Sequence, residues 1–528
     1  MRLRKKMKRL SLFFFVIVFS YSTLAYTLHD PIVIENLETT ADKPYIIEGY
    51  EITNPTGPCI QVRHTDHVII RNNYIHDCGT KISESIQKKI RNGEGDARLA
   101  MMSNPDSTGG MNVFDPLTVK ISNNKIINND YGIRITGHDQ KIESALINDN
   151  TVQSNHRSHF IFVQNSDNVN IYNNYVKDNG LSLFIDNVGL QKAFEKGEDF
   201  GDGRMQGILT DSCSQVKIFN NTVINSSSDG IAVVGNDNKL AEDIEIFNNL
   251  VMRNGEQGLW IVKARNGKIH HNNVTENTHR IDTTGGSSGI MFEGEVYDFK
   301  IFDNDVSYND AFGIFFIEST DNEVYNNQIH HNGDGAFGWK NIFFYEEYKY
   351  ADKHDDGITT IRDNNVHQNR IAVFHIWTEI IGKVIVKDNI FDWNGGNPLH
   401  YEMYDDFEMK SHQEDWEYNG EQEFFHTSNN DFIREINKFE ILTNTIDSQE
   451  VTGKLELKGK PEKSEQEDIE DIEDVSEGKE EKEIENNTYE NTFEECNYTA
   501  EKVYIALFFI TLIALIVILI LYIKKKRK

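Results

Sequence analysis

A short asparagine-containing unit recurs along most of this 528-residue sequence. Each copy has Asn-Asn or Asp-Asn followed two positions later by an apolar residue, and most copies lie about 24 residues apart. Two longer intervals, of 51 and 47 residues, correspond either to two periods or to one period with an insertion. The second members of the dipeptides are Asn73, Asn124, Asn150, Asn174, Asn221, Asn249, Asn273, Asn304, Asn327, Asn364 and Asn389. Because apolar residues alternate with polar ones inside each unit, the pattern predicts a parallel β-helix over about residues 32–400.

Asparagine suits the sharp turn that each coil of a β-helix must make, because it adopts the left-handed backbone conformation at little cost. Coils stacked about 4.8 Å apart would align the side-chain amides into a hydrogen-bonded ladder. The inward Ile, Val and Phe side chains would form one continuous core, so that each coil is stabilised by its neighbours. The repeat therefore indicates an all-β fold and leaves the activity open.

The unit NN-x-I-x-x-N…G-I-x-h, in which h is apolar, resembles the right-handed parallel β-helix repeat family. That family includes pectate-lyase-like enzymes, alginate epimerases and the β-helix accessory protein of nitrous oxide reductase maturation. The resemblance covers about residues 32–400 and implies a right-handed solenoid, a fold shared by lyases, hydrolases, epimerases and passive surface proteins. The sequence lacks the DPHD motif of the epimerases and the NTD, DD and GHG set of polygalacturonases, of which Gly137-His138-Asp139 is only a fragment. The resemblance therefore implies no specific reaction.

Both ends of the chain contain membrane-targeting signals. Residues 1–25 combine basic residues, an apolar core and the small residues Thr23 and Ala25, which predicts a signal peptide cleaved after Ala25. Residues 503–523 are uncharged and long enough to cross a hydrocarbon core of about 30 Å as a helix. The basic residues 524–528 place that end in the cytoplasm, so we expect a single-pass type I protein of the cell membrane with its β-helix outside the cell.

The sequence between these signals divides into an ectodomain and a stalk. The ectodomain, residues 26–445, contains the repeat and an acidic, aromatic segment at 400–445. Residues 446–502 follow, and the part from 461 to 500 holds 16 Asp or Glu and 3 Lys with few apolar residues, which predicts an extended, disordered stalk. The whole chain has 84 acidic and 53 basic residues, and its net charge of −31 argues against a nucleic-acid partner.

The chain has 4 Cys, too few for a disulfide scaffold. Cys59 and Cys78 either form a disulfide bond across the first coils or remain as two thiols. Cys213 is expected in the core, and Cys496, close to the predicted membrane helix, would be available to pair between chains.

Alignment of the G-I-x-h strands predicts which side chains point away from the core. One outward column reads Gln61, Asn112, Arg134, Ile161, Leu209, Ala232, Trp260, Met291, Phe315, Phe343 and His375, and the other reads Arg63, Phe114, Thr136, Val163, Asp211, Val234, Val262, Glu293, Ile317, Tyr345 and Trp377. A slip of one residue is allowed near 158–160 and 370–374. The aromatic residues would form a platform for sugar rings, or else lie buried beneath the 400–445 segment. The substrate-binding residues predicted in this way are Trp260, Phe315, Tyr345 and Trp377.

Acidic side chains accompany the same strands. The predicted catalytic residues are Glu293, Glu318, Glu346 and His375. Carboxylates on neighbouring coils would lie about 5 Å apart, a separation that suits the acid and nucleophile of a retaining glycosidase. Asp355 and Asp356 would join these carboxylates in an oxygen-rich Ca²⁺ site, and Ca²⁺ is the one cofactor that the sequence suggests. The alternative is that all these groups are solvated acids on an acidic rod.

Two pairs of adjacent histidines, His270-His271 and His330-His331, lie at or near Asn turns. Neighbouring residues on a strand point to opposite faces, so each pair is interpreted as two surface or turn residues that do not share a metal ion.

These patterns predict a membrane-anchored extracellular β-helix protein that binds or processes carbohydrate in a groove along the parallel sheet. If the protein is an enzyme, it is a polysaccharide lyase or a glycoside hydrolase. The alternative is a non-catalytic structural or adhesion module of the cell surface. Because an acidic chain repels a polyanion at low salt unless cations bridge the two, the charge favours a neutral glycan.

Overall fold

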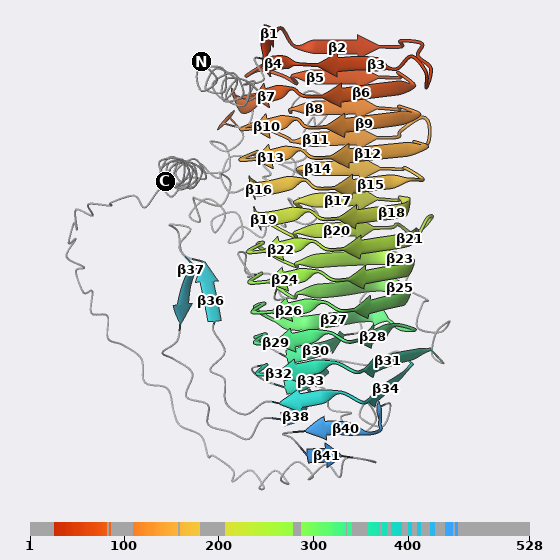
Figure 1. Ribbon diagram of the computed structural model, residues 1–528, viewed down its shortest axis with the longest axis vertical. Helices are drawn as coiled ribbons and strands as arrows, with labels where there is room; N and C mark the ends of the chain where they lie inside the picture. Colours follow the sequence, from red (N-terminus) through yellow and green to blue (C-terminus); the bar gives the residue numbers. More distant parts are fainter. Residues whose placement is uncertain are drawn as a thin grey trace, which may run out of the picture. The chain divides into compact units, whose positions relative to one another are not determined.

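A computed structural model shows the fold of the chain (Figure 1). The residues that it describes are 26–81, 84–85, 109–156, 159–179, 206–277, 287–333, 335–340, 357–369, 372–376, 382–392, 400–403, 409–412, 423–427, 439–446 and 449–451.

The described residues form a stack of coils, and each coil contributes a first, a second and a third β-strand. The first strands are β2 (Ile32–Glu35), β5 (Ile60–Arg63), β8 (Met111–Phe114), β11 (Ile133–Thr136), β14 (Ile161–Gln164), β17 (Ile208–Asp211), β20 (Ile231–Val234), β27 (Phe312–Ser319), β30 (Gly335–Lys340), β33 (Ala372–Ile376) and β38 (Glu423–Thr427). The second strands are β3 (Tyr45–Glu48), β6 (His67–Arg71), β9 (Thr118–Ser122), β12 (Ser144–Asn148), β15 (Val169–Tyr172), β18 (Ser214–Phe219), β21 (Ala241–Phe247), β28 (Glu323–Tyr325), β31 (Ile358–Arg362), β34 (Lys383–Lys387) and β39 (Phe439–Ile441). In two coils the first and second strands are continuous, as β23 (Leu259–His270) and β25 (Ile290–Phe302).

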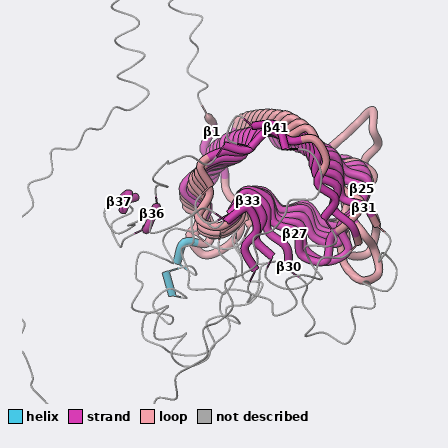
Figure 2. The backbone as a smooth tube through the Cα atoms, turned by 90° about the horizontal axis from the view of Figure 1, so that it is seen from below, coloured by secondary structure: helices cyan, strands magenta, loops and turns pink. Residues whose placement is uncertain are grey.

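The third strands form a separate parallel sheet, and Figure 2 shows the strands of successive coils lying over one another. They are β1 (Thr27–His29), β4 (Tyr50–Thr53), β7 (Tyr74–His76), β10 (Lys125–Ile127), β13 (Thr151–Gln153), β16 (Tyr175–Asn179), β19 (Thr222–Ser226), β22 (Leu250–Met252), β24 (Asn273–Thr275), β26 (Asp305–Ser307), β29 (Gln328–His330), β32 (Asn365–His367), β35 (Ile390–Asp392) and β40 (Asn444–Ile446). β41 (Gln449–Val451) pairs antiparallel with β40, and β36 (His400–Met403) with β37 (Met409–His412). The predicted parallel β-helix is therefore confirmed.

The core is a continuous cluster of inward-facing Ile, Val and Phe side chains. Parallel pairing places like residues over one another, as where Ile133 pairs with Met111 on one side and with Ile161 on the other. All three of these side chains are fully buried. Alternation within each strand thus supplies the core, and stacking makes it continuous.

A ladder of buried asparagines connects the second strand to the third strand in each coil. Asn249 is representative: its Oδ1 accepts hydrogen bonds from the backbone N–H and the Nδ2 of Asn221, at 3.0 and 3.1 Å. Its Nδ2 donates to the Ile218 carbonyl and to Oδ1 of Asn272, both at 2.9 Å. The members of this first ladder are Asn73, Asn124, Asn150, Asn174, Asn221, Asn249, Asn272, Asn304, Asn327, Asn364, Asn389 and Asn444.

The ladder confirms the predicted repeat, corrects one of its details and decides between two alternatives for another. Asn272 is the ladder member, whereas Asn273, which the dipeptide pattern indicates, is the first residue of β24. The intervals of 51 and 47 residues each contain one coil with an insertion, because Asn73 bonds directly to Asn124 and Asn174 directly to Asn221.

A second asparagine ladder runs at the ends of the third strands from β10 to β32, and the sequence analysis did not predict it. Its members bond through the same amide geometry, as where Nδ2 of Asn254 donates to Oδ1 of Asn277 at 2.9 Å. Ser226 interrupts it, although the backbone N–H of Ser226 still donates to Oδ1 of Asn254. The other members are Asn129, Asn155, Asn179, Asn309, Asn332 and Asn369.

The residue before each ladder member except Asn444 makes the turn. Asn248 precedes Asn249 with a φ of 55°, and Tyr308 precedes Asn309 with a φ of 54°. One residue thus adopts the left-handed backbone conformation, and the next supplies the amide of the ladder. The turn residue can vary in type wherever the stacked coils compensate for its backbone strain.

The glycine that opens each G-I strand is fixed by close packing. A Cβ on Gly258 would lie 2.3 Å from Cγ1 of Val274 and 2.6 Å from the carbonyl oxygen of Gly289. It would also lie 2.8 Å from Nδ2 of Asn277 in the second ladder. The corresponding glycines, with equally close third-strand contacts, are Gly207, Gly230, Gly289 and Gly313.

The coils continue beyond residue 400, where the repeat was expected to give way to an acidic, aromatic segment. β38 pairs with β33, and Asn444 bonds to Asn389 as the last member of the first ladder. The long stretch between β35 and β38 hides this additional coil from a search for a fixed period.

Cys59 and Cys78 form a disulfide bond with a Cα–Cα distance of 5.6 Å. Both are fully buried, and Cys213 is a buried free thiol. Among the residues that the structure describes, no helix is long and apolar enough to cross a membrane. The predicted signal peptide, residues 1–25, and the predicted membrane helix, residues 503–523, lie outside those residues.

Candidate functional site

The outward face of the first strands contains two columns of residues, defined by the pairing register. The first column reads Gln61, Asn112, Arg134, Phe162, Leu209, Ala232, Trp260, Met291, Phe315, Gly338 and His375. The second column reads Arg63, Phe114, Thr136, Gln164, Asp211, Val234, Val262, Glu293, Ile317 and Lys340.

The register differs from the expected columns at two coils. In β14 the anticipated one-residue slip occurs, so Phe162 stands in the column and Ile161 points into the core. In β30 the column position is Gly338, because β30 pairs with β27 several residues before the expected Phe343. Insertions of unequal length shift the strand relative to the repeat, which alignment by period alone does not detect.

From Phe162 to Phe315 the first column is apolar and largely closed. Met291, Phe315 and Ile317 form one outer cluster with Ala311 and Phe312, separate from the main core. A second outer cluster consists of Phe162, Leu209 and Ala232. Trp260 is partly buried and packs against both clusters. Burial therefore removes Phe315 from the expected aromatic platform and leaves Trp260 as its partly exposed member in the described part of the face.

The indole of Trp260 is held by a carboxylate of the next coil. Its Nε1 donates a hydrogen bond to Oε2 of Glu293 at 2.8 Å, and Glu293 is itself partly exposed in the second column. Two coils away, Nε2 of Gln164 donates to Oδ2 of Asp211 at 2.7 Å. The partly exposed part of the outward face thus combines the oriented indole ring of Trp260 with amide and carboxylate groups.

The other predicted site residues have different surroundings. Phe315 is only 1% exposed, so its ring presents no open face. Glu318 is 8% exposed and has a φ of 50°. Because Glu293 pairs with Ile317 and the register shifts after it, Glu318 does not continue the column of Glu293. The backbone of His375 pairs with Gly338, which places it in the first column. The remaining predicted residues lie outside the described ranges, and these are Tyr345, Glu346, Asp355, Asp356 and Trp377.

Two buried acids that the sequence analysis missed precede the first strands near Trp260. The hydroxyl of Ser228 lies 2.9 Å from Oε2 of Glu256 and 3.4 Å from Oδ2 of Asp229. Asp229 also accepts hydrogen bonds from the Gln257 backbone N–H and from the Gln206 side chain, at 3.0 and 3.1 Å. Carboxylates from neighbouring coils therefore surround one hydroxyl group, and the signal in the sequence is an acid one or two positions before the G-I glycine.

A buried histidine lies at the same edge of the face. The ring of His159 packs on Phe162, with ring centroids 5.0 Å apart. Burial lowers the pKa of His159 to about 4, so its imidazole is neutral at physiological pH. His159 therefore contacts the outer cluster through Phe162 and offers no positive charge to a ligand at neutral pH.

A set of proteins of known structure shares the fold at low sequence identity. The mannuronan C-5 epimerase A-module of Azotobacter vinelandii is 10% identical, with 80% of each chain covered and a TM-score of 0.35. The lacto-N-biosidase of Eubacterium ramulus is 12% identical, with 80% of this chain and 60% of that chain covered and a TM-score of 0.35. The tailspike receptor binding domain of siphovirus 9NA is 9% identical, with 70% of each chain covered and a TM-score of 0.38.

A search of the curated proteins found no match. The family described as "Right handed beta helix region" matches residues 17–180 and 132–296, which together make up more than half of the chain. The matched residues contain the first ladder from Asn73 to Asn272 and the second from Asn129 to Asn277, with the G-I strands between them. The chain therefore belongs to the right-handed β-helix family.

Proposed function

We propose that this protein is a membrane-anchored extracellular β-helix that binds carbohydrate on the outward face of its first strands, around Trp260. The observation that carries the proposal is the hydrogen bond that fixes the partly exposed Trp260 ring beside Glu293. Sugar rings stack on indole because their C–H faces are apolar, and their hydroxyl groups bond to carboxylate and amide groups at the rim. Glu293, Asp211 and Gln164 supply those groups on the same face.

The negative charge of the protein favours neutral glycans over anionic ones. With a net charge of −31 and partly exposed carboxylates on the binding face, the protein repels polyuronates at low salt. We therefore propose a neutral glycan, bound outside the cell. The extracellular location rests on the sequence signals at residues 1–25 and 503–523, which would direct the chain into the secretory route and hold it in the membrane.

Trp260→Ala is expected to weaken binding of a neutral glycan by about 5- to 30-fold, because removal of a stacking ring costs on the order of 1–2 kcal/mol. Trp260→Phe is the matched control: it keeps an aromatic face, loses the Nε1 donor and should retain most of the affinity. The measurement is a glycan array, followed by titration of the full-length protein in detergent with the strongest neutral ligand. Equal affinity of the wild-type protein and Trp260→Ala would place the binding site elsewhere.

The pair of buried acids favours a second function, hydrolysis of the bound glycan. Glu256, which precedes the strand of Trp260, and Asp229, which precedes the strand of the coil before it, converge on one hydroxyl group, and two neighbouring carboxyl groups are the catalytic set of most glycoside hydrolases. If the protein cleaves the glycan, new reducing ends should appear with the wild-type protein and disappear with Glu256→Gln, while binding persists. Binding without any cleavage by the wild-type protein would identify a passive surface module.

A further inference from the structure

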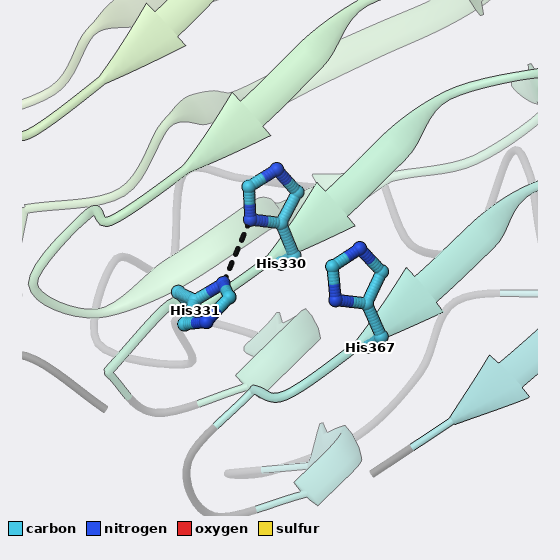
Figure 3. Close-up of side chains that lie close together, drawn as sticks. All are labelled: His330, His331 and His367. Carbon is cyan, nitrogen blue, oxygen red and sulfur yellow. Dashed lines mark hydrogen bonds between the residues drawn. The ribbon is translucent and has the colours of Figure 1, made fainter. Parts of the chain in front are cut away.

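Three imidazoles from two successive coils converge at the turn that follows the third strand (Figure 3). His330 is the last residue of β29, His331 makes the turn, and His367 is the last residue of β32. The candidate ligand atoms of the three residues all lie within 4.8 Å of one another. The cluster belongs to the third-strand sheet and is separate from the Trp260 face.

The left-handed turn brings the adjacent pair together. In an extended strand, neighbouring side chains point to opposite faces, which is the reason for the expectation that the pair shares no metal. His331 instead has a φ of 55°, and its Nδ1 lies 2.8 Å from Nδ1 of His330. The two rings meet edge-on, at an interplanar angle of 84°. Both rings therefore face the same space.

The third imidazole is placed by the coil register. His330 pairs with His367, so their rings stack with centroids 4.7 Å apart and planes inclined by 5°. Nε2 of His330 lies 3.2 Å from Oδ1 of Asp305 in the preceding coil. A carboxylate at the far nitrogen of a histidine orients the ring and leaves the near nitrogen for a metal ion.

Metal binding needs a nitrogen lone pair on each imidazole. The Nδ1 atoms of His330 and His331 already face each other. Since at least one of the two facing Nδ1 atoms must carry a proton for the 2.8 Å contact, an incoming metal ion would replace that proton.

We propose that His330, His331 and His367 bind one divalent transition-metal ion of borderline softness, such as Zn²⁺. Three imidazoles and one open position are a set that Zn²⁺ accepts. Tetrahedral Zn²⁺ with bonds of about 2.0–2.1 Å needs nitrogen atoms roughly 3.4 Å apart with their lone pairs aimed at the ion, so the stacked rings of His330 and His367 must turn out of their parallel arrangement when the site forms.

The chain contains a matched comparison for this cluster. His270 and His271 repeat the geometry at the first ladder: their Nδ1 atoms are 2.9 Å apart, the rings meet at 84°, and His271 has a φ of 55°. His270 stacks at 4.7 Å on Phe302 of the next coil, in the position that corresponds to His367. The two clusters differ in the third ring, and only one of them offers three nitrogen ligands.

The test is competitive Zn²⁺ titration of the full-length protein in detergent against a chelating dye. His367→Phe copies the natural His270–Phe302 stack and should fold, yet lower Zn²⁺ affinity by at least about 10–100-fold, the effect typical of damage to a metal site. His271→Ala, which alters the matched pair, should leave the affinity unchanged. Phe302→His should add a second Zn²⁺ equivalent.

Two results would overturn the proposal. If His367→Phe binds Zn²⁺ as tightly as the wild-type protein, the third imidazole is not a ligand. If Phe302→His adds no Zn²⁺ equivalent, a histidine stacked on such a pair does not create a site, and the stack of imidazoles at His330 serves packing alone. Neither result depends on glycan binding, so the outcome is distinct from that of the Trp260 experiments.

Discussion

Asn249→Ala is expected to lower the free energy of unfolding by about 3–5 kcal/mol. The Asn249 amide makes hydrogen bonds to two neighbouring coils, and its side chain is 2% exposed. Alanine would leave the backbone N–H of Asn221 and the Ile218 carbonyl without this partner, and each unsatisfied buried polar group costs about 1–3 kcal/mol. The measurement is denaturant unfolding of the full-length protein followed by circular dichroism.

The neighbouring residue provides the control. Asn248 is exposed and left-handed, and glycine adopts that conformation without strain. Asn248→Gly should therefore change the free energy of unfolding by less than about 0.5 kcal/mol. Equal losses for the two variants would mean that the turn, and not the ladder, provides the stability.

Gly258→Ala is expected to destabilise the protein by at least about 3 kcal/mol, and to prevent accumulation of folded protein at higher temperature. The new methyl group would collide with a side chain, with the ladder and with backbone: its nearest atoms are those of Val274, Gly289 and Asn277, at 2.3–2.8 Å. Overpacking that side chains alone relieve costs about 1–3 kcal/mol, and backbone displacement adds to it. Thermal unfolding and soluble yield measure the effect.

A second substitution separates the two sources of strain. Val274→Ala removes the closest contact but leaves the carbonyl oxygen of Gly289 in place. The double variant Gly258→Ala/Val274→Ala should therefore recover less than half of the stability lost through Gly258→Ala. Full recovery would show that the conflict lies between side chains only, and that the backbones of adjacent coils have room to separate.

The sequence was sufficient for the fold because the fold repeats. Each coil repeats the same alternation of apolar and polar residues and the same Asn turn, so the period of the sequence was enough to predict the parallel stack. The second ladder escaped notice because its turn residue varies. Where the first ladder usually has Asn or Asp before the amide, the second has Arg253, Glu276, Tyr308, His331 and Gln368. A pattern search for paired asparagines cannot find such turns.

The candidate site was less predictable, for reasons that particular residues illustrate. Phe162 and Gly338 entered the outward column through insertions whose length the period does not fix. Trp260 was correctly placed on the face, but its bond to Glu293 depends on the relation between two coils. Glu318 follows Ile317, which holds the column position opposite Glu293 as the sequence predicts. Asp229 and Glu256 each lie shortly before the glycine of a G-I strand, and in the sequence alone such a segment looks like part of a turn.

The left-handed position before each second-ladder asparagine has a consequence for how this surface changes over evolution. Cationic, anionic, phenolic, imidazole and amide side chains all occupy it, while the amide that follows keeps the coils in register. Substitution there leaves core volume and strand pairing untouched. The molecule thus has a row of interchangeable positions at intervals of about 4.8 Å, at which new chemistry is acquired one coil at a time.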